Sequence, residues 1–201
     1  MLGVIWLVMG GGLSMAAPLK AQQILVLGDS VSAGYGLASS QGWVSLLERK
    51  LSGKANVINA SVSGETSAGG KSRLPALLAK HQPTIVLIEL GGNDALRGLA
   101  LSATQHNLTE MIRAAQATKA KVLLIGMQVP PNYGKAYTAQ FQRLFLDVAR
   151  AEKIPVVPFL LAALAGQRDA FQADGIHPIA AAQPRLLDTV WPQLRPLLDQ
   201  K

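Results

Sequence analysis

The chain has 201 residues, of which 49% are hydrophobic and 15% are charged, and its formal net charge at neutral pH is +7. This length and hydrophobic content suit one folded domain with a substantial core and argue against disorder. The absence of cysteine excludes disulfides, thiolate metal sites and a cysteine nucleophile. The lysines and arginines are scattered, and the longest basic run is the pair Arg49-Lys50, so we expect a solvated basic surface and no nucleic-acid partner.

The first 18 residues carry no charged side chain and resemble a secretory signal peptide. An apolar run, Val4–Leu13, is followed by small residues, and cleavage after Ala16 or Ala21 fits the usual rule. No lysine or arginine precedes the run, and a retained anchor is the alternative. A glycine triplet interrupts the run, however, and spanning a membrane takes about 20 apolar residues. We therefore expect a removed signal peptide over residues 1–21, one domain over 22–201 that does not stay inserted in a membrane, and a periplasmic or secreted protein.

Five apolar runs alternate with segments whose apolar residues recur at helical spacing. The predicted strands are Ile24–Leu27, Asn56–Asn59, Thr84–Leu90, Lys121–Met127 and Pro155–Phe159. The predicted helices are Gly42–Leu51, Lys71–Lys80, Thr104–Thr118, Lys135–Lys153 and Ala180–Leu198. This alternation predicts a five-stranded parallel sheet with helices on both faces, a three-layer α/β/α domain.

Ser30 directly follows the first predicted strand, in the sequence Gly28-Asp29-Ser30. In open parallel sheets, ligands bind at the carboxyl ends of the strands, so a hydroxyl here is placed as a nucleophile requires. The alternative is that Ser30 caps the following helix, which is a common use of serine. Ser32 is followed by Ala33, so the Gly-x-Ser-x-Gly nucleophile elbow of the α/β-hydrolases is absent.

A serine nucleophile needs a base, and His177 is the best placed of the three histidines. It lies three residues after Asp174, a spacing that lets the carboxylate accept a hydrogen bond from Nδ1–H while Nε2 faces the serine. The alternative is a capping aspartate beside an incidental histidine. Metal binding is less attractive, because no second histidine or carboxylate pair completes a ligand set.

Acyl transfer also needs hydrogen-bond donors directed at the carbonyl oxygen, where negative charge develops. The backbone N–H groups of Ser30 and Gly64 and the side-chain amide of Asn93 are candidate donors, since each follows a different predicted strand. The alternative is that the glycine serves a turn and that Asn93 caps a helix.

The blocks Gly28-Asp29-Ser30, Gly64, Gly91-Gly92-Asn93-Asp94 and Asp174-Gly175-Ile176-His177-Pro178 occur in the order found in the SGNH (GDSL-type) hydrolases, which this chain resembles over nearly its whole mature length. Stretches between the blocks, such as Asn59–Ser67 and Pro131–Gly134, resemble the exported bacterial acyl-CoA thioesterase I, lysophospholipase or arylesterase subgroup. Gly64 is followed by Glu65 where the subgroup pattern has Asp. The resemblance implies a flavodoxin-like sheet of order 2-1-3-4-5, a monomer, and no metal or cofactor.

The resemblance further implies that Ser30 is the nucleophile, His177 the base and Asp174 its orienting partner, with Ser30, Gly64 and Asn93 forming the oxyanion hole. The expected substrates are acyl thioesters, lysophospholipids and aryl esters, with the loop Met127–Tyr133 on the substrate side. An apolar wall for the substrate is expected from Tyr35, Leu37, Leu96, Leu99, Pro131, Tyr133 and Ile176. The alternative is that these residues only pack the loops.

Two other functions stay open at this point. The SGNH fold also supports carbohydrate or peptidoglycan O-acetylesterases, which differ in accepting only short acyl groups. A non-catalytic module that binds lipid or an anionic polymer through its basic surface is the alternative from another class.

Overall fold

The structure is a computed structural model of the chain, and it describes residues 22–199. Five parallel strands form one sheet with the order β2-β1-β3-β4-β5, so the predicted fold class and strand order are both confirmed. The strands are β1 (Gln22–Gly28), β2 (Ala55–Asn59), β3 (Ile85–Glu89), β4 (Lys121–Ile125) and β5 (Val156–Val157). β1 lies between β2 and β3, which brings the loops after these three strands together at one edge.

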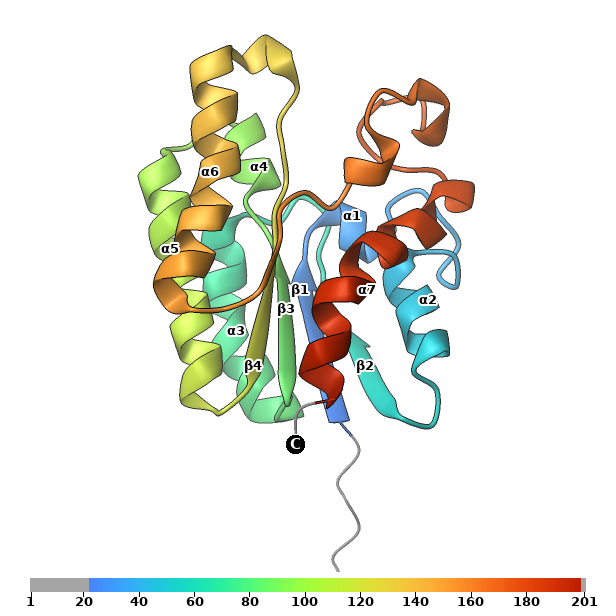
Figure 1. Cartoon of the computed structure of the whole chain (residues 1–201), viewed down its shortest axis with the longest axis vertical. Coiled ribbons are helices and arrows are strands. Elements are labelled where there is room, and N and C mark those ends of the chain that lie inside the picture. The colour runs from blue at the N-terminus through green and yellow to red at the C-terminus, as the bar shows by residue number, and fades with distance from the viewer. Residues whose placement is uncertain (1–21, 200–201) are drawn as a thin grey trace, which may run out of the picture.

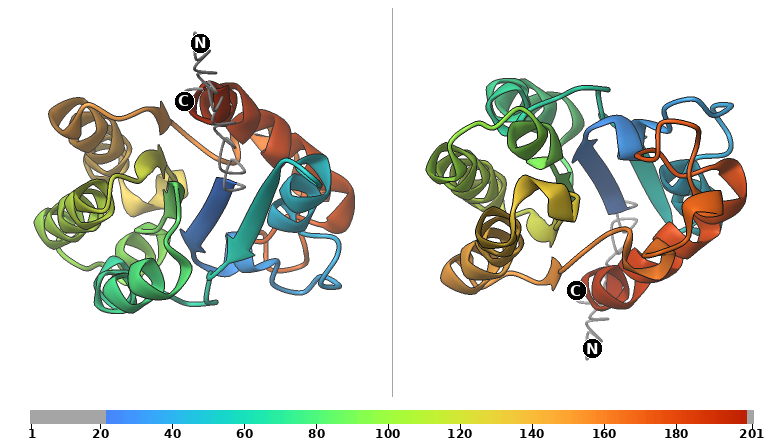
Figure 2. Two further views of the ribbon diagram at one scale, coloured as in Figure 1. Left: turned by 90° about the horizontal axis from the view of Figure 1, so that it is seen from below. Right: turned by 90° about the horizontal axis from the view of Figure 1, so that it is seen from above.

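Helices cover both faces of the sheet (Figure 1). The longer helices are α2 (Trp43–Lys50), α3 (Ser67–His81), α5 (Leu101–Ala117), α6 (Lys135–Glu152) and α7 (Gln183–Asp199). α3, α5 and α6 pack side by side on one face, and α2 packs against α7 on the other, as the end-on views in Figure 2 show. The short elements are α1 (Ser30–Ala33), α4 (Gly92–Leu96), η1 (Pro131–Tyr133), η2 (Ala162–Leu164), η3 (Arg168–Ala170) and η4 (Ala180–Ala182).

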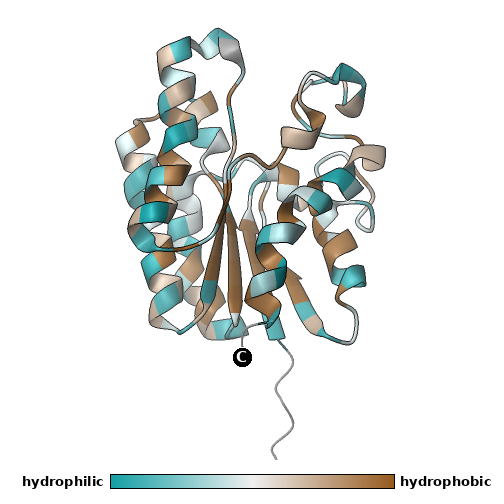
Figure 3. Cartoon of the chain, viewed as in Figure 1, coloured by the Kyte–Doolittle hydropathy of each residue, from teal (hydrophilic) through white to brown (hydrophobic). Residues whose placement is uncertain are grey.

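The core is the sheet together with the helix faces turned toward it. All five residues of β3 are buried, as are Ile24 to Gly28 of β1, and the apolar stretches of these central strands are brown in Figure 3. In α5 the apolar stripe of Leu108, Met111, Ile112 and Ala115 is fully buried. Burial of such branched side chains, at roughly 25 cal/mol per Å² of apolar area, stabilises the rigid platform from which the carboxyl-edge loops project.

Two predicted helix starts are wrong. α3 begins at Ser67 and not at Lys71, because the Thr66 hydroxyl caps it by accepting a hydrogen bond from Gly69 N–H at 3.2 Å. Two glycines therefore lie inside its first turn, where a side chain on Gly70 would collide with Leu90. α5 begins at Leu101 and not at Thr104, since the apolar stripe alone does not reveal its first turn.

Two further boundaries differ from prediction at the end of the chain. The segment Ala180–Leu198 is not one helix: the separate 3₁₀ turn η4 precedes α7, which begins at Gln183. β5 has two residues where Pro155–Phe159 was predicted, because Pro155 and Pro158 have no N–H to donate to a neighbouring strand. The short helices α1 and α4 were not predicted, since four or five residues carry no helical periodicity.

No helix within residues 22–199 is both long and apolar enough to cross a membrane. The predicted signal peptide, residues 1–21, lies outside the described part of the chain.

Candidate active site

Ser30 is the first residue of α1, immediately beyond the carboxyl end of β1. Asp29 caps this helix, because its Oδ1 accepts a hydrogen bond from Val31 N–H at 3.0 Å. The cap is therefore Asp29 and not Ser30, which removes the alternative role considered for Ser30. The Ser30 side chain is half-buried, and its Oγ lies 2.8 Å from His177 Nε2.

His177 and Asp174 lie on the loop between η3 and η4, which reaches Ser30 from a distant part of the sequence. His177 Nδ1 lies 2.7 Å from Asp174 Oδ2, while Asp174 Oδ1 accepts the backbone N–H groups of Ile176 at 2.8 Å and His177 at 3.0 Å. The hydrogen bond from His177, followed by these two backbone bonds, lowers the pKa of Asp174 to about 2. An ionised Asp174 accepts a hydrogen bond from Nδ1–H, which keeps the proton on Nδ1 and leaves Nε2 as the acceptor that faces Ser30.

The loop that carries His177 is fixed by glutamine side chains from both directions. Gln172 donates to the carbonyl of Tyr35 at 2.8 Å, and the Tyr35 ring lies 4.6 Å from the His177 ring, centroid to centroid. Gln183, at the start of α7, donates to the Pro178 carbonyl at 3.3 Å and accepts the N–H of Trp43 at 2.9 Å. These bonds hold the imidazole at hydrogen-bonding distance from Ser30.

Two of the expected oxyanion donors are unengaged backbone groups. The N–H groups of Ser30 and Gly64 donate to no acceptor within residues 22–199. Gly64 has φ +78°, a left-handed conformation that favours glycine, and its carbonyl accepts Arg97 Nη2 at 2.9 Å. Arg97, which directly follows α4, therefore holds the peptide group between Gly64 and Glu65 in place.

The third expected donor, Asn93, already has two acceptors. Its Nδ2 donates to the Glu65 carbonyl at 3.0 Å and to Asp29 Oδ2 at 3.2 Å. Both amide protons are thus used, and donation to a substrate oxygen requires the longer bond to Asp29 to be released or shared. This linkage between Asn93 and the cap of α1 is not visible in the sequence.

A second carboxyl, Glu89, lies beneath the Gly28-Asp29-Ser30 turn and was missed by the sequence analysis. It is the last residue of β3, it is 0% exposed, and its Oε2 accepts Ser32 Oγ at 2.7 Å and Asp29 N–H at 3.3 Å. Burial and the nearby charge of Asp29 raise the pKa of Glu89 well above its usual value. Burial also raises the pKa of Asp29 to about 6, against the opposing effects of the Val31 N–H and His177.

Asp94, the last residue of the Gly91-Gly92-Asn93-Asp94 block, forms buried hydrogen bonds with residues of α3 and α5. It accepts the Ser67 N–H at 2.8 Å, the Ser67 hydroxyl at 2.5 Å and the Thr104 hydroxyl at 3.2 Å. The fourth residue of this network, Asn107, donates to the Ser67 hydroxyl at 3.0 Å. Asp94 is thus a structural acceptor that fixes α4, and with it Asn93, against α3 and α5.

The residues expected to contact substrate divide into exposed and packed groups. Tyr35, Leu99, Tyr133 and Ile176 are each between 39% and 52% exposed, and Val62, which the sequence analysis did not select, is 46% exposed. Four of the five lie on loops at the carboxyl edge, and Tyr133 is the last residue of η1 at the same edge. Leu96 packs against the core and its carbonyl accepts Tyr133 Oη at 3.3 Å, Leu37 is half-buried, and Pro131 begins η1.

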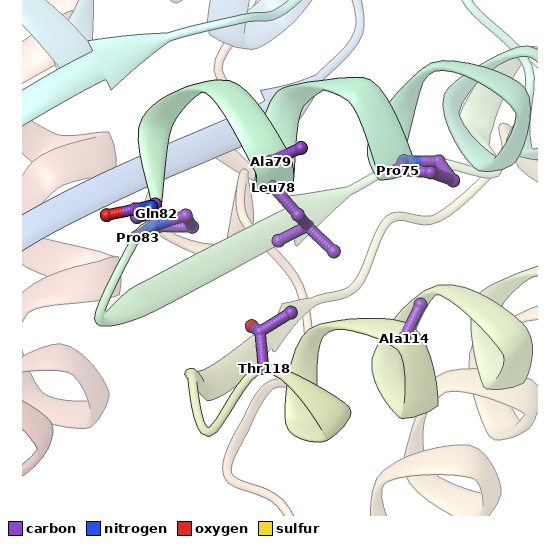
Figure 4. A pocket seen from close by; sticks show the side chains of 7 residues that line it. All are labelled: Pro75, Leu78, Ala79, Gln82, Pro83, Ala114 and Thr118. Atoms are coloured by element: carbon purple, nitrogen blue, oxygen red, sulfur yellow. The ribbon is translucent and has the colours of Figure 1, made fainter.

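A hollow of about 660 Å³ lies between α3 and α5 at the opposite, amino edge of the sheet (Figure 4). It is lined by Pro75, Leu78, Ala79, Gln82, Pro83, Ala114 and Thr118. This lining offers no nucleophile beyond one threonine and no acid or base, so it is not a candidate active site. Within the described residues, no group of three or more His, Asp or Glu side chains is arranged to hold a metal ion.

Known proteins resemble this chain in sequence and in fold. Residues 26–183 match the GDSL-like Lipase/Acylhydrolase family. Esterase TesA of Pseudomonas aeruginosa is 56% identical over 181 residues, which cover 89% of this chain and 90% of that protein. Thioesterase 1/protease 1/lysophospholipase L1 of Escherichia coli K12 is 42% identical over 179 residues, with 89% and 86% covered. A crystal structure of TesA matches with a TM-score of 0.84 at 55% identity, covering 88% of this chain and 99% of that one.

The parallel-sheet fold, together with the polar residues that follow its strands at the carboxyl edge, defines a hydrolase of the flavodoxin-like α/β class. The chain belongs to the GDSL-like lipase and acylhydrolase family, the SGNH hydrolases, and it is an ester and thioester hydrolase.

Proposed function

We propose that the enzyme works through an acyl-enzyme on Ser30. His177 Nε2 removes the hydroxyl proton as Oγ attacks the carbonyl carbon of the ester or thioester, and the carbonyl oxygen becomes an oxyanion. Collapse of this intermediate breaks the bond to the leaving alcohol or thiol, which takes the proton from His177. Water then attacks the acyl-enzyme, with His177 as base again, and releases the acid. The supporting observation is the hydrogen-bonded series Ser30–His177–Asp174, with separations of 2.8 and 2.7 Å.

The oxyanion is stabilised in this proposal by the N–H groups of Ser30 and Gly64 and by the amide of Asn93. The two backbone donors have no acceptor among residues 22–199, which supports this role. One amide N–H of Asn93 changes its hydrogen-bond acceptor from Asp29 Oδ2 to the oxyanion as charge develops. Each such donor typically contributes about 2.7–4 kcal/mol to lowering the barrier.

The proposed substrates are acyl thioesters, lysophospholipids and aryl esters with medium to long apolar groups. The names of the two curated relatives, an esterase and a thioesterase and lysophospholipase, support this range. The exposed side chains of Tyr35, Tyr133 and Ile176, of which the Tyr35 ring lies 4.6 Å from the His177 ring, support an apolar contact with the acyl or aryl group. Leu37, Leu96 and Pro131 contribute to the same wall in this proposal.

The test is hydrolysis of p-nitrophenyl esters from acetyl to palmitoyl by the wild type and by Ser30→Ala. We expect turnover that rises with acyl length beyond acetyl and falls to the background rate in the variant. Activity on acetyl esters alone identifies an O-acetylesterase instead. Ester binding without turnover by the folded wild type identifies a non-catalytic binding module, and an unchanged rate in Ser30→Ala rules out the serine mechanism.

We further propose that the enzyme is a periplasmic or secreted monomer, released when residues 1–21 are removed. The support is the apolar amino-terminal run followed by small residues. Mass spectrometry of the exported protein tests this directly, since cleavage after Ala16 or Ala21 gives two different masses and a retained anchor gives the full-length mass.

A further inference from the structure

Glu89 occupies a position that is built to receive a carboxyl group. It is paired in register with Gly28, the glycine of the Gly28-Asp29-Ser30 turn. A Cβ on Gly28 would lie 2.8 Å from Glu89 Oε2 and 2.7 Å from Ser32 Cβ. The absence of a side chain at Gly28 therefore leaves the space in which Glu89 reaches the nucleophile turn from below.

The Glu89 carboxyl has few partners for a completely buried group. Oε2 accepts two hydrogen bonds, from the Ser32 hydroxyl and the Asp29 N–H, whereas the buried Oε1 has no partner among the described residues. No lysine or arginine is paired with Glu89 in the described part of the chain. An ionised carboxylate that is completely buried without a cation is strongly disfavoured.

The contacts of the neighbouring carboxyl, Asp29, indicate which of the two groups keeps the proton. Asp29 is 3% exposed and accepts one N–H at each oxygen, from Val31 at Oδ1 and from Asn93 at Oδ2. Two adjacent buried carboxyls do not both ionise, and the charge is better placed on Asp29, whose two oxygens each accept a hydrogen bond, than on Glu89, whose Oε1 has no partner among the described residues. The other titratable groups that act on this pair are Asp94 of α4 and His177, and both act on Asp29.

We propose that Glu89 is a positioning residue that remains protonated in the working enzyme. As a neutral acid it anchors the turn that presents Ser30, through the Ser32 hydroxyl and the Asp29 N–H. It also leaves Asp29 as the charged member of the pair, able to accept the Asn93 amide and to favour the positive charge that forms on His177 during catalysis. This inference rests on Ser30 being the nucleophile, since Glu89 acts only by holding that turn and its donors in place.

The test compares Glu89→Gln with Glu89→Ala. Glutamine keeps an oxygen for the two donors and places its amide where the protonated Oε1 lies, so we expect kcat within about threefold of wild type. Alanine removes the anchor, and we expect kcat to fall on the order of 10- to 100-fold while KM changes little, because the reacting groups are misplaced rather than lost. A Glu89→Gln enzyme as impaired as Glu89→Ala overturns the proposal, because it shows that the charge is required.

Asp94→Asn is the matched control, since Asp94 is a second buried carboxyl at the same edge. Its two oxygens accept three donors from Ser67 and Thr104, so an amide there must direct its N–H₂ at a donor. We expect Asp94→Asn to lower the melting temperature more than Glu89→Gln does. The reverse order contradicts the assignment of the proton to Glu89.

Infrared difference spectroscopy supplies a readout that does not depend on activity. We expect the wild-type minus Glu89→Gln spectrum at neutral pH to contain the C=O stretch of a protonated carboxylic acid. A carboxylate band in its place overturns the proposal. The band is the same in a Ser30→Ala background, so a wrong nucleophile assignment and a wrong Glu89 assignment give different results.

Discussion

Replacing Asp174 by asparagine tests how the loop geometry sets the protonation of His177. Asp174 Oδ1 accepts two backbone N–H groups, from Ile176 and His177, whereas Oδ2 faces His177 Nδ1 at 2.7 Å. In Asp174→Asn the amide oxygen must occupy the Oδ1 position, because only an oxygen accepts those two donors. The amide N–H₂ then points at Nδ1, and the imidazole proton moves to Nε2, which faces Ser30 Oγ.

This tautomer has no lone pair with which to accept the serine proton. We therefore expect kcat for p-nitrophenyl butyrate to fall on the order of 10⁴-fold, which corresponds to about 5.4 kcal/mol of barrier. The free energy of unfolding should change by no more than about 1 kcal/mol, since the two backbone bonds remain and the site is partly exposed to water. Steady-state kinetics and urea unfolding measure the two quantities separately.

Asp174→Ala is the informative comparison, because it removes the partner without imposing a tautomer. Water can then accept from Nδ1–H, so Asp174→Ala should be more active than Asp174→Asn although it is less conservative. Equal activities, or more than about one tenth of wild-type kcat in Asp174→Asn, refute the reasoning from the Oδ1 contacts.

Three other predictions follow from the contacts of the nucleophile turn. Asn93→Ala should lower kcat and kcat/KM together by about 10²- to 10³-fold. A decrease in kcat of less than about tenfold in steady-state assays argues against Asn93 as an oxyanion donor. Burial raises the pKa of Asp29 from 3.8 to about 6, so between these pH values the folded state binds more protons than the unfolded state. The free energy of unfolding therefore falls as pH rises through this window, by on the order of 3 kcal/mol. The melting temperature of Asp29→Asn relative to wild type should therefore increase from about pH 4 to pH 6, and a constant difference contradicts the burial argument. Gly28→Ala should lower the free energy of unfolding in urea by about 1–3 kcal/mol, because its Cβ would lie 2.7 Å from Ser32 Cβ. An unchanged free energy of unfolding contradicts this steric argument.

Local patterns in the sequence were sufficient for the layers of the fold and for the residues that gather at the carboxyl edge. Buried apolar runs such as Ile24–Leu27 identify strands, and polar residues placed after them identify the edge at which ligands bind. The strand order came from the family resemblance and not from periodicity, since no local pattern states which strands are neighbours. Helix starts such as Ser67 were missed because a cap and packed glycines, and not the apolar stripe, determine them.

What the sequence could not provide is the pairing of polar groups from distant segments. Glu89 is the last residue of an otherwise apolar strand. Its structural role depends on its lying in register with Gly28, 61 positions earlier. Asn93 was predicted as a free donor, but its amide is held by Asp29 and Glu65, and both contacts exist only once three loops are brought together. The roles of Ser30, His177 and Asp174 stay predictions until they are tested chemically.

The most direct test of the account is the site of covalent labelling by a reactive alkyl phosphonate ester, which forms a stable mimic of the tetrahedral intermediate on a nucleophilic serine. After proteolysis and mass spectrometry, we predict a single phosphonylated residue, Ser30, with labelling retained in Ser32→Ala, slowed in His177→Ala and abolished in Ser30→Ala. Labelling that persists in Ser30→Ala, or that maps to Ser32 or Ser61 in the wild type, contradicts the proposed acyl-enzyme.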